Sequence, residues 1–199
     1  DQLFDFSSVP LVSLSKAKGT VQLDDHTVVN ATGDLTVKAD AISAAKPTFA
    51  SPILFSAAWA ESTAEASTKV QGQTELNAGG AAKVQASTDV EVNVTATVNS
   101  TNKPIDAVFV YADNSATTTA ETGADTRIRA GSVEVSAANT TDLSVSGTAA
   151  NTGGSGVGIA VAVNLSENKV TATLGGDAAS TSGDVDVKAS IDMAKNGTA

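Results

Sequence analysis

The sequence predicts an all-β protein whose strands stack into a parallel β-helix (β-solenoid) with internal repeats of about fifty residues. Three observations favour this fold class. Glycine-led strand motifs recur at nearly constant spacing, and each motif alternates apolar with polar residues. Small residues dominate the 199-residue chain, in which aromatic residues make up only 4%. Small apolar side chains suit a narrow interior in which like residues stack on one another.

The repeat begins with a short motif led by glycine. GDLTVKA begins at Gly33, GAAKVQA at Gly80, GSVEVSA at Gly131 and GDVDVKA at Gly183, so the intervals are 47, 51 and 52 residues. Each motif predicts a strand whose alternate residues face opposite sides. A fixed period in this range is typical of solenoids and other arrays.

The alternation assigns a buried and a solvated face to each motif. In the last copy, Val185, Val187 and Ala189 would face the interior, and Asp184, Asp186 and Lys188 would face solvent. The apolar set is similar in every copy whereas the polar set varies, as expected when one face is buried. We therefore predict that Val187→Asp destabilises the fold strongly and that Asp186→Ser does not.

Other segments suggest further strands within each repeat. Residues 106–124 and 158–176 both show an apolar alternating run, an Asn/Ser bend, a Thr-rich strand and a glycine. Residues 141–147 suggest one more strand. Since a coil takes roughly 20 to 25 residues, we expect two coils per repeat, and eight or nine coils in a rod roughly 40 Å long. Residues 57–68 have a helix-forming composition and could form a short helix or a protruding loop.

Residues 1–199 are expected to form a single elongated segment of a larger protein. The chain begins at Asp1, and its apolar start lacks the basic leader of a signal peptide. The main alternative fold is a β-sandwich-type domain with antiparallel strands. A propeller is disfavoured because the chain has barely four periods and no closing motif in each blade.

Charge and composition exclude several classes of function. The net charge of −10 argues against nucleic acid and against an anionic membrane surface as partners. No segment is long and apolar enough to predict membrane insertion. The absence of cysteine excludes a disulfide framework and a thiolate metal site.

Residues 156–176, followed by GDVDVKAS, resemble the repeats of large bacterial filamentous adhesins of the filamentous-haemagglutinin-like and leukotoxin-type families. Those repeats are also rich in Ala, Val, Thr, Asn and Gly, with GIAVAVN-like strands followed by NxVTA-like strands. The resemblance covers residues 131–189 well, 80–130 moderately and 1–70 poorly. It implies a right-handed β-helix, an extracellular location and a role in adhesion or as a stalk, and it carries no catalytic residues. Right-handed crossovers are also the rule for parallel strands.

Asp24, Asp25 and His26 form the one cluster that suggests acid–base chemistry. Some parallel β-helices are polysaccharide-cleaving enzymes with paired acids. Adjacent residues of a strand point to opposite faces, however, so we expect a bend between two strands here. A metal site is not expected, because the chain has no second histidine and no cysteine.

Phe49, Phe55 and Trp59 are candidate contacts for a ligand or partner. Exposed aromatic rings often stack on sugars, whereas buried rings would pack over an open end of the solenoid; the sequence leaves both open. Asp184 and Asp186 could bind surface calcium, but no calcium-loop motif accompanies them and no cofactor is predicted. Paired outward threonines occur at residues 95 and 97, 117 and 119, and 171 and 173.

These observations favour a non-enzymatic structural or adhesive segment of a secreted or cell-surface protein. The expected partners are the protein itself, through lateral or end-to-end association, and host or matrix polysaccharide. Two alternatives remain. One is a carbohydrate-active or carbohydrate-binding β-helix, and the other is an ice- or surface-binding protein that uses its Thr-rich faces.

Overall fold

The computed structural model describes residues 10–51, 55–153 and 156–199, and this part of the chain is all-β. Within it, no helix is long and apolar enough to cross a membrane. The prediction that the apolar start of the chain is not a signal peptide concerns residues that fall partly outside the described ranges. The strands are β1 (Leu11–Leu23), β2 (Val28–Ala31), β3 (Leu35–Ala45), β4 (Thr48–Ser51), β5 (Phe55–Val70), β6 (Glu75–Ala78), β7 (Ala81–Thr101), β8 (Ile105–Thr122), β9 (Arg127–Ala130), β10 (Ser132–Thr152), β11 (Val157–Thr173), β12 (Asp177–Ser180) and β13 (Val185–Thr198).

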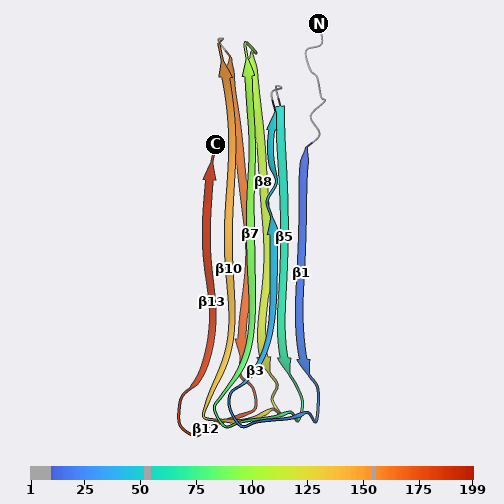
Figure 1. Cartoon of the computed structure of the whole chain (residues 1–199), viewed down its shortest axis with the longest axis vertical. Coiled ribbons are helices and arrows are strands. Elements are labelled where there is room, and N and C mark those ends of the chain that lie inside the picture. The colour runs from blue at the N-terminus through green and yellow to red at the C-terminus, as the bar shows by residue number, and fades with distance from the viewer. Residues whose placement is uncertain (1–9, 52–54, 154–155) are drawn as a thin grey trace.

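The strands form three parallel sheets (Figure 1). Sheet A has the order β1-β5-β8-β11, sheet B has the order β2-β6-β9-β12, and sheet C has the order β3-β7-β10-β13, with β4 also paired to β7. Sheets A and C are long, and the short sheet B lies at one end of both (Figure 1). All pairings between described strands are parallel, so the alternative fold, an antiparallel sandwich, is wrong.

Residues that pair in the sheets are separated by the repeat period predicted from the sequence. In sheet A, for example, Leu11 pairs with Ala58, 47 residues later. The four glycines that begin the repeats stack through backbone hydrogen bonds: the amides of Gly80, Gly131 and Gly183 donate to the preceding glycine's carbonyl at 3.0, 2.6 and 2.7 Å. The chain therefore passes once through sheets A, B and C in each repeat.

The expectation of two coils per repeat is wrong. The glycine-led motif and residues 141–147 belong to one strand, β10, and the apolar and Thr-rich parts of residues 106–124 belong to β8. The Asn/Ser segments expected to bend lie inside β8 and β11, and residues 57–68 lie in β5 rather than in a helix or loop.

The long strands determine the shape of the molecule. A strand of 21 residues such as β10 extends roughly 70 Å, whereas four stacked strands span only about 15 Å. The long axis therefore runs along the strands and not along the direction of stacking, as Figure 1 shows. The described chain holds four passes through the sheets instead of eight or nine coils.

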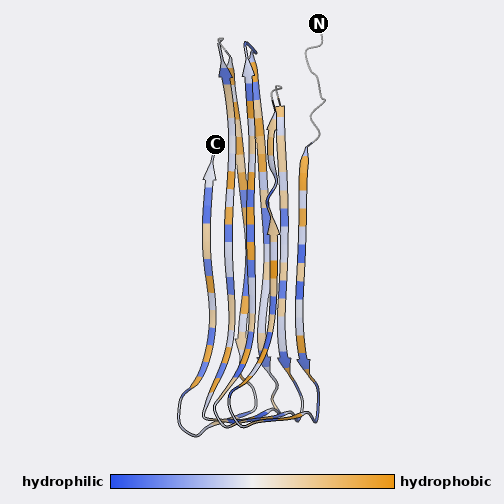
Figure 2. Cartoon of the chain, viewed as in Figure 1, coloured by the Kyte–Doolittle hydropathy of each residue, from blue (hydrophilic) through white to orange (hydrophobic). Residues whose placement is uncertain are grey.

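The core lies between sheets A and C. Residues along the long strands alternate between buried and exposed positions, and Figure 2 shows hydrophobic and hydrophilic residues interspersed along these strands. In sheet C, Val37, Val84, Val135 and Val187 stack in one inward column. Because most buried side chains are Ala and Val, the two sheets can approach closely.

The predicted faces of the glycine-led motifs are confirmed. The position at which a substitution should destabilise the fold most is not the predicted one. Val187 pairs with Val135 and shares its face. Val135 is completely buried, whereas Val187 lies in the edge strand β13 and is 48% exposed. The strong destabilisation predicted for Val187→Asp therefore belongs at Val135, where a carboxylate would be enclosed.

Polar side chains also cross the interior between the two long sheets. Ser43 of sheet C hydrogen-bonds Ser62 of sheet A at 2.7 Å, and Thr88 of sheet C hydrogen-bonds Thr118 of sheet A at 2.6 Å. Asn139 donates to the Thr88 Oγ1 at 2.8 Å. We call these buried residues the polar seam. Because slippage of a strand would leave these groups unpaired, the seam favours a single register.

Candidate functional site

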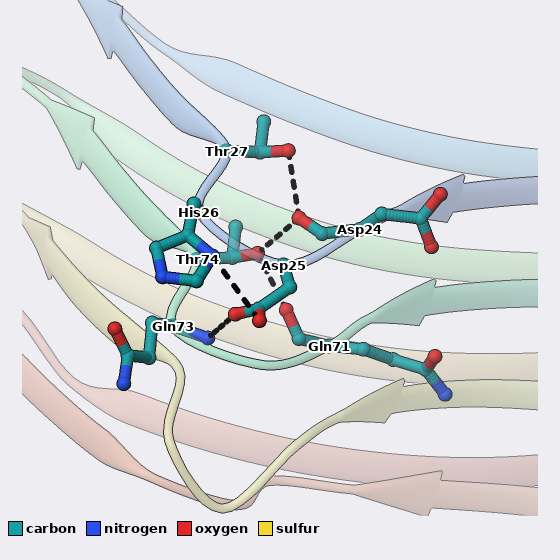
Figure 3. Close-up of polar contacts among 7 residues, drawn as sticks. All are labelled: Asp24, Asp25, His26, Thr27, Gln71, Gln73 and Thr74. Atoms are coloured by element: carbon teal, nitrogen blue, oxygen red, sulfur yellow. Dashed lines mark hydrogen bonds and ion pairs between the residues drawn. The ribbon is translucent and has the colours of Figure 1, made fainter.

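Asp24, Asp25 and His26 form the bend between β1 and β2, as the sequence predicts. His26 adopts a left-handed backbone conformation, with φ of 63°. Its Nδ1 lies 3.1 Å from the Asp25 Oδ2, and both side chains are more than half exposed. The Asp24 carboxylate points away from this pair (Figure 3) and accepts a hydrogen bond from Gln22. The two carboxylates therefore do not converge on one point.

The hydrogen bonds of this bend hold successive repeats together. The Asp25 Oδ1 accepts from the backbone amide of Gln73 at 2.7 Å, and the Thr74 hydroxyl donates to the Asp24 carbonyl at 2.9 Å (Figure 3). Both partners belong to the bend of the next repeat. The carboxylate of Asp25 thus caps an amide of the neighbouring layer, which is a structural role.

A threonine ends the bend in three successive repeats. The hydroxyls of Thr27 and Thr74 donate to the first carbonyl of their own bends at 2.7 and 2.5 Å, and that of Thr126 donates to the carbonyl of Val70, the last residue of β5, at 3.3 Å. The aspartates and the histidine of the first bend do not recur at the equivalent positions, where QGQT and GADT stand. The recurring threonine, spaced by 47 and 52 residues, is a structural signal that inspection of the DDH cluster alone overlooks.

A shallow hollow of about 550 Å³ lies over the outer face of sheet B next to His26. Its lining includes Glu75, Asp125, Arg127 and Asp177. Arg127 and Glu75 form an ion pair of 3.0 Å, so these two opposite charges neutralise each other. Among the described residues, no group of three or more His, Cys, Asp or Glu side chains is placed to hold a metal ion.

The three candidate aromatic residues divide between two sheets. Phe55 and Trp59 lie in β5 on the outer face of sheet A, and they are 44% and 41% exposed. Phe49 lies in β4 of sheet C and pairs with the fully buried Ala96, so it belongs to an inward row. Phe55 and Trp59 can therefore contact a partner together, whereas Phe49 does not share their face.

The structure adds Tyr111 and Phe109 of β8 to this aromatic site. Trp59 pairs in register with Tyr111, 52 residues later, and their ring centroids lie 4.1 Å apart with planes tilted by 33°. Sequence inspection did not group these residues, although the offset equals the repeat period. Desolvation, together with the nearby charge of Asp113, raises the pKa of Tyr111 above its usual value.

The remaining candidates are scattered over outward positions. Residues 117, 119, 171 and 173 lie on the outer face of sheet A, whereas residues 95 and 97 lie on that of sheet C. The threonine pairs therefore do not form one array. Asp186 forms an ion pair of 3.0 Å with Lys188, and this hydrogen bond raises the pKa of the lysine.

No family model, curated protein or solved structure matches this chain in the comparisons with known proteins. The resemblance to filamentous adhesins therefore depends on the sequence motifs described above.

Proposed function

We propose that this chain is a segment of a right-handed parallel β-solenoid that acts as a non-enzymatic stalk, filament or multivalent attachment module of a large secreted or cell-surface bacterial protein. The observation that carries the proposal is the common register of all three sheets, each of which gains one strand per repeat. Stacked repeats of this kind contact mainly their neighbours, so a chain can be lengthened by adding repeats.

The contacts between repeats support a mechanical role. β7 and β10 pair over 21 residues, and β8 and β11 pair over 17. The bends add side-chain bonds between layers, such as that of Asp25 to the Gln73 amide. Separating a repeat from its neighbour breaks all of these contacts, which supports cohesion along the stack.

The first experiment stretches the chain between two handle domains in a force spectrometer. One repeat of 47 to 52 residues should release roughly 170 to 190 Å of extended chain, at about 3.6 Å per residue. We expect successive steps of this size. One step that releases the whole chain at low force would contradict a stack of mechanically separate repeats.

A second experiment separates this proposal from an enzyme. The protein is incubated with acidic and neutral polysaccharides, and both the released oligosaccharides and the retained protein are measured. We expect no released product. Product formation would contradict the proposal and favour the carbohydrate-active alternative, whereas retention without product would identify the polysaccharide to which the module attaches.

A further inference from the structure

The outer face of sheet A carries an apolar surface where its strands begin. We define the sheet-A patch as the exposed large apolar side chains of residues 12–14, 55–59, 105–109 and 157–165. It holds ten of the sixteen exposed large apolar side chains in the described part of the chain. All four strands of the sheet contribute to it.

The register makes this patch continuous. Phe55 pairs with Ala107, which pairs with Ile159, and the adjacent outward row joins Phe109 to Val161. The patch lies at the end of sheet A opposite sheet B (Figure 1). None of its ten side chains is charged, although Leu14 and Leu165 share their outward row with the carboxylates of Glu61 and Asp113. The other eight side chains lie in rows without a charged residue.

The strands beneath the patch are apolar on both sides. Val108 and Val110 of β8 face the core, while Phe109 between them faces out. Continuous apolar runs are typical of parallel strands that are covered on both faces. Sheet C covers the inner face of these strands, and no described element covers their outer face.

The size of the patch matches one side of a stable protein interface. Its side chains are 37% to 70% exposed. At roughly 100 to 200 Å² of surface for a large apolar side chain, ten half-exposed ones present about 500 to 1,000 Å². A specific interface buries about 800 Å² on each partner, whereas the largest apolar patch of a typical monomer covers roughly 300 to 600 Å².

We propose that the sheet-A patch is the surface through which two copies of this chain pair laterally, with sheet A of one copy against sheet A of the other. Seven of its ten side chains are aliphatic, which favours packing against another apolar sheet over stacking on sugar rings. The net charge of −10 disfavours an anionic lipid surface as the partner. A single patch used by both copies forms a closed twofold pair.

The outer face of sheet C is polar and provides a control for the sheet-A patch. Its one exposed large apolar side chain in the described ranges is Ile42 of β3, which pairs with Asp89. Ile42 is 71% exposed and Ile159 is 50% exposed, and each lies in an edge strand of its sheet. The two isoleucines therefore form a matched pair for substitution inside and outside the patch.

The test combines sedimentation with fluorescence. Trp59 is the sole tryptophan of the chain and lies in the patch, so its emission reports directly on whether the patch is covered. In analytical ultracentrifugation over micromolar concentrations, we expect a reversible dimer. On dilution to monomer, the emission of Trp59 should shift to longer wavelength and its quenching by acrylamide should increase.

Ile159→Lys is expected to raise the dimer dissociation constant by about tenfold or more, because it buries a charge in the interface. Ile42→Lys should leave dimerisation unchanged. Both changes are at exposed positions, and far-UV circular dichroism checks that each variant is folded. If Ile159→Lys does not fold, Val161→Lys in the adjacent row provides the same test.

Three results would overturn the proposal: a monomer at all concentrations, a dimer that Ile159→Lys does not weaken, or equal weakening by Ile42→Lys. A monomer whose Trp59 emission shifts only when a polysaccharide is added would assign the patch to carbohydrate instead. Lateral pairing goes beyond the proposed function and is tested independently of it. A monomer that unfolds in repeat-sized steps would refute the pairing alone, and a dimer that releases oligosaccharides would refute only the non-enzymatic role.

Discussion

Replacing Val135 and Val187 separately by alanine tests whether the end of the stack is open. The two valines pair with each other in sheet C and belong to the same inward column. Val135 is fully buried between two neighbouring strands, whereas Val187 is 48% exposed in the edge strand β13. The same chemical change is therefore made in an enclosed and in an open environment.

The structure predicts different energetic costs for the two substitutions. Val→Ala removes two carbon atoms, and burial of each contributes about 0.8 kcal/mol. At Val135 the cavity left behind adds about 1 kcal/mol, so the total loss is about 2.5 kcal/mol. At Val187 only about half of the transfer energy is lost and no enclosed cavity forms, so the expected loss is about 0.8 kcal/mol.

The free energies of unfolding are measured by urea denaturation followed by far-UV circular dichroism. Asp186→Ser is the surface control, because its exposed ion pair with Lys188 should contribute little. Equal losses for Val135→Ala and Val187→Ala would refute the reasoning, since they would mean that β13 is covered as completely as β10.

Three further predictions follow from individual contacts. Asp113→Asn should lower the pKa of Tyr111 toward its usual value, because the Asp113 charge adds to desolvation in raising it; absorbance titration of this sole tyrosine measures the change. In the wild type, this raised pKa contributes stability below the unfolded pKa of 10.0, and the contribution is lost as the pH rises through the folded value. Asp25→Ala should cost about 1 kcal/mol in urea denaturation, because the Gln73 amide loses its acceptor, and it should leave polysaccharide retention unchanged. Thr88→Val should cost roughly 1 to 3 kcal/mol in the same assay, because it leaves buried partners in the polar seam unpaired.

The period and the faces of the repeat could be predicted because both depend on local chemistry. Glycine suits a point where successive layers approach closely: a Cβ on Gly131 would lie 3.0 Å from the carbonyl oxygen of Gly80. Most inward positions hold small apolar side chains, as at Val37 and Val84. Spacing and alternation in the sequence therefore record the stacking directly.

The length of the strands could not be predicted, because buried polar residues within a strand resemble turn residues. Asn114 interrupts the apolar run of β8 and suggests a bend. In the structure this side chain is 1% exposed and donates to the Asn168 Oδ1 of β11 at 3.4 Å. Asparagine within a run therefore indicates either a turn or a buried pair, and only the partner from the next repeat decides between them.

The orientation of β11 explains why the sheet-A patch was not predicted. Along residues 157–163 large and small residues alternate, and either set could face the core. The structure turns Ala160 inward and Ile159 outward, because the interior at this level is already filled: a Cβ on Gly147 of sheet C would lie 3.1 Å from Val110. A narrow interior thus requires the small set inside and displaces the large set to the surface. The alternation is satisfied in either orientation. The width of the core, which depends on sheet C, therefore determines that the large apolar side chains lie on the outer face.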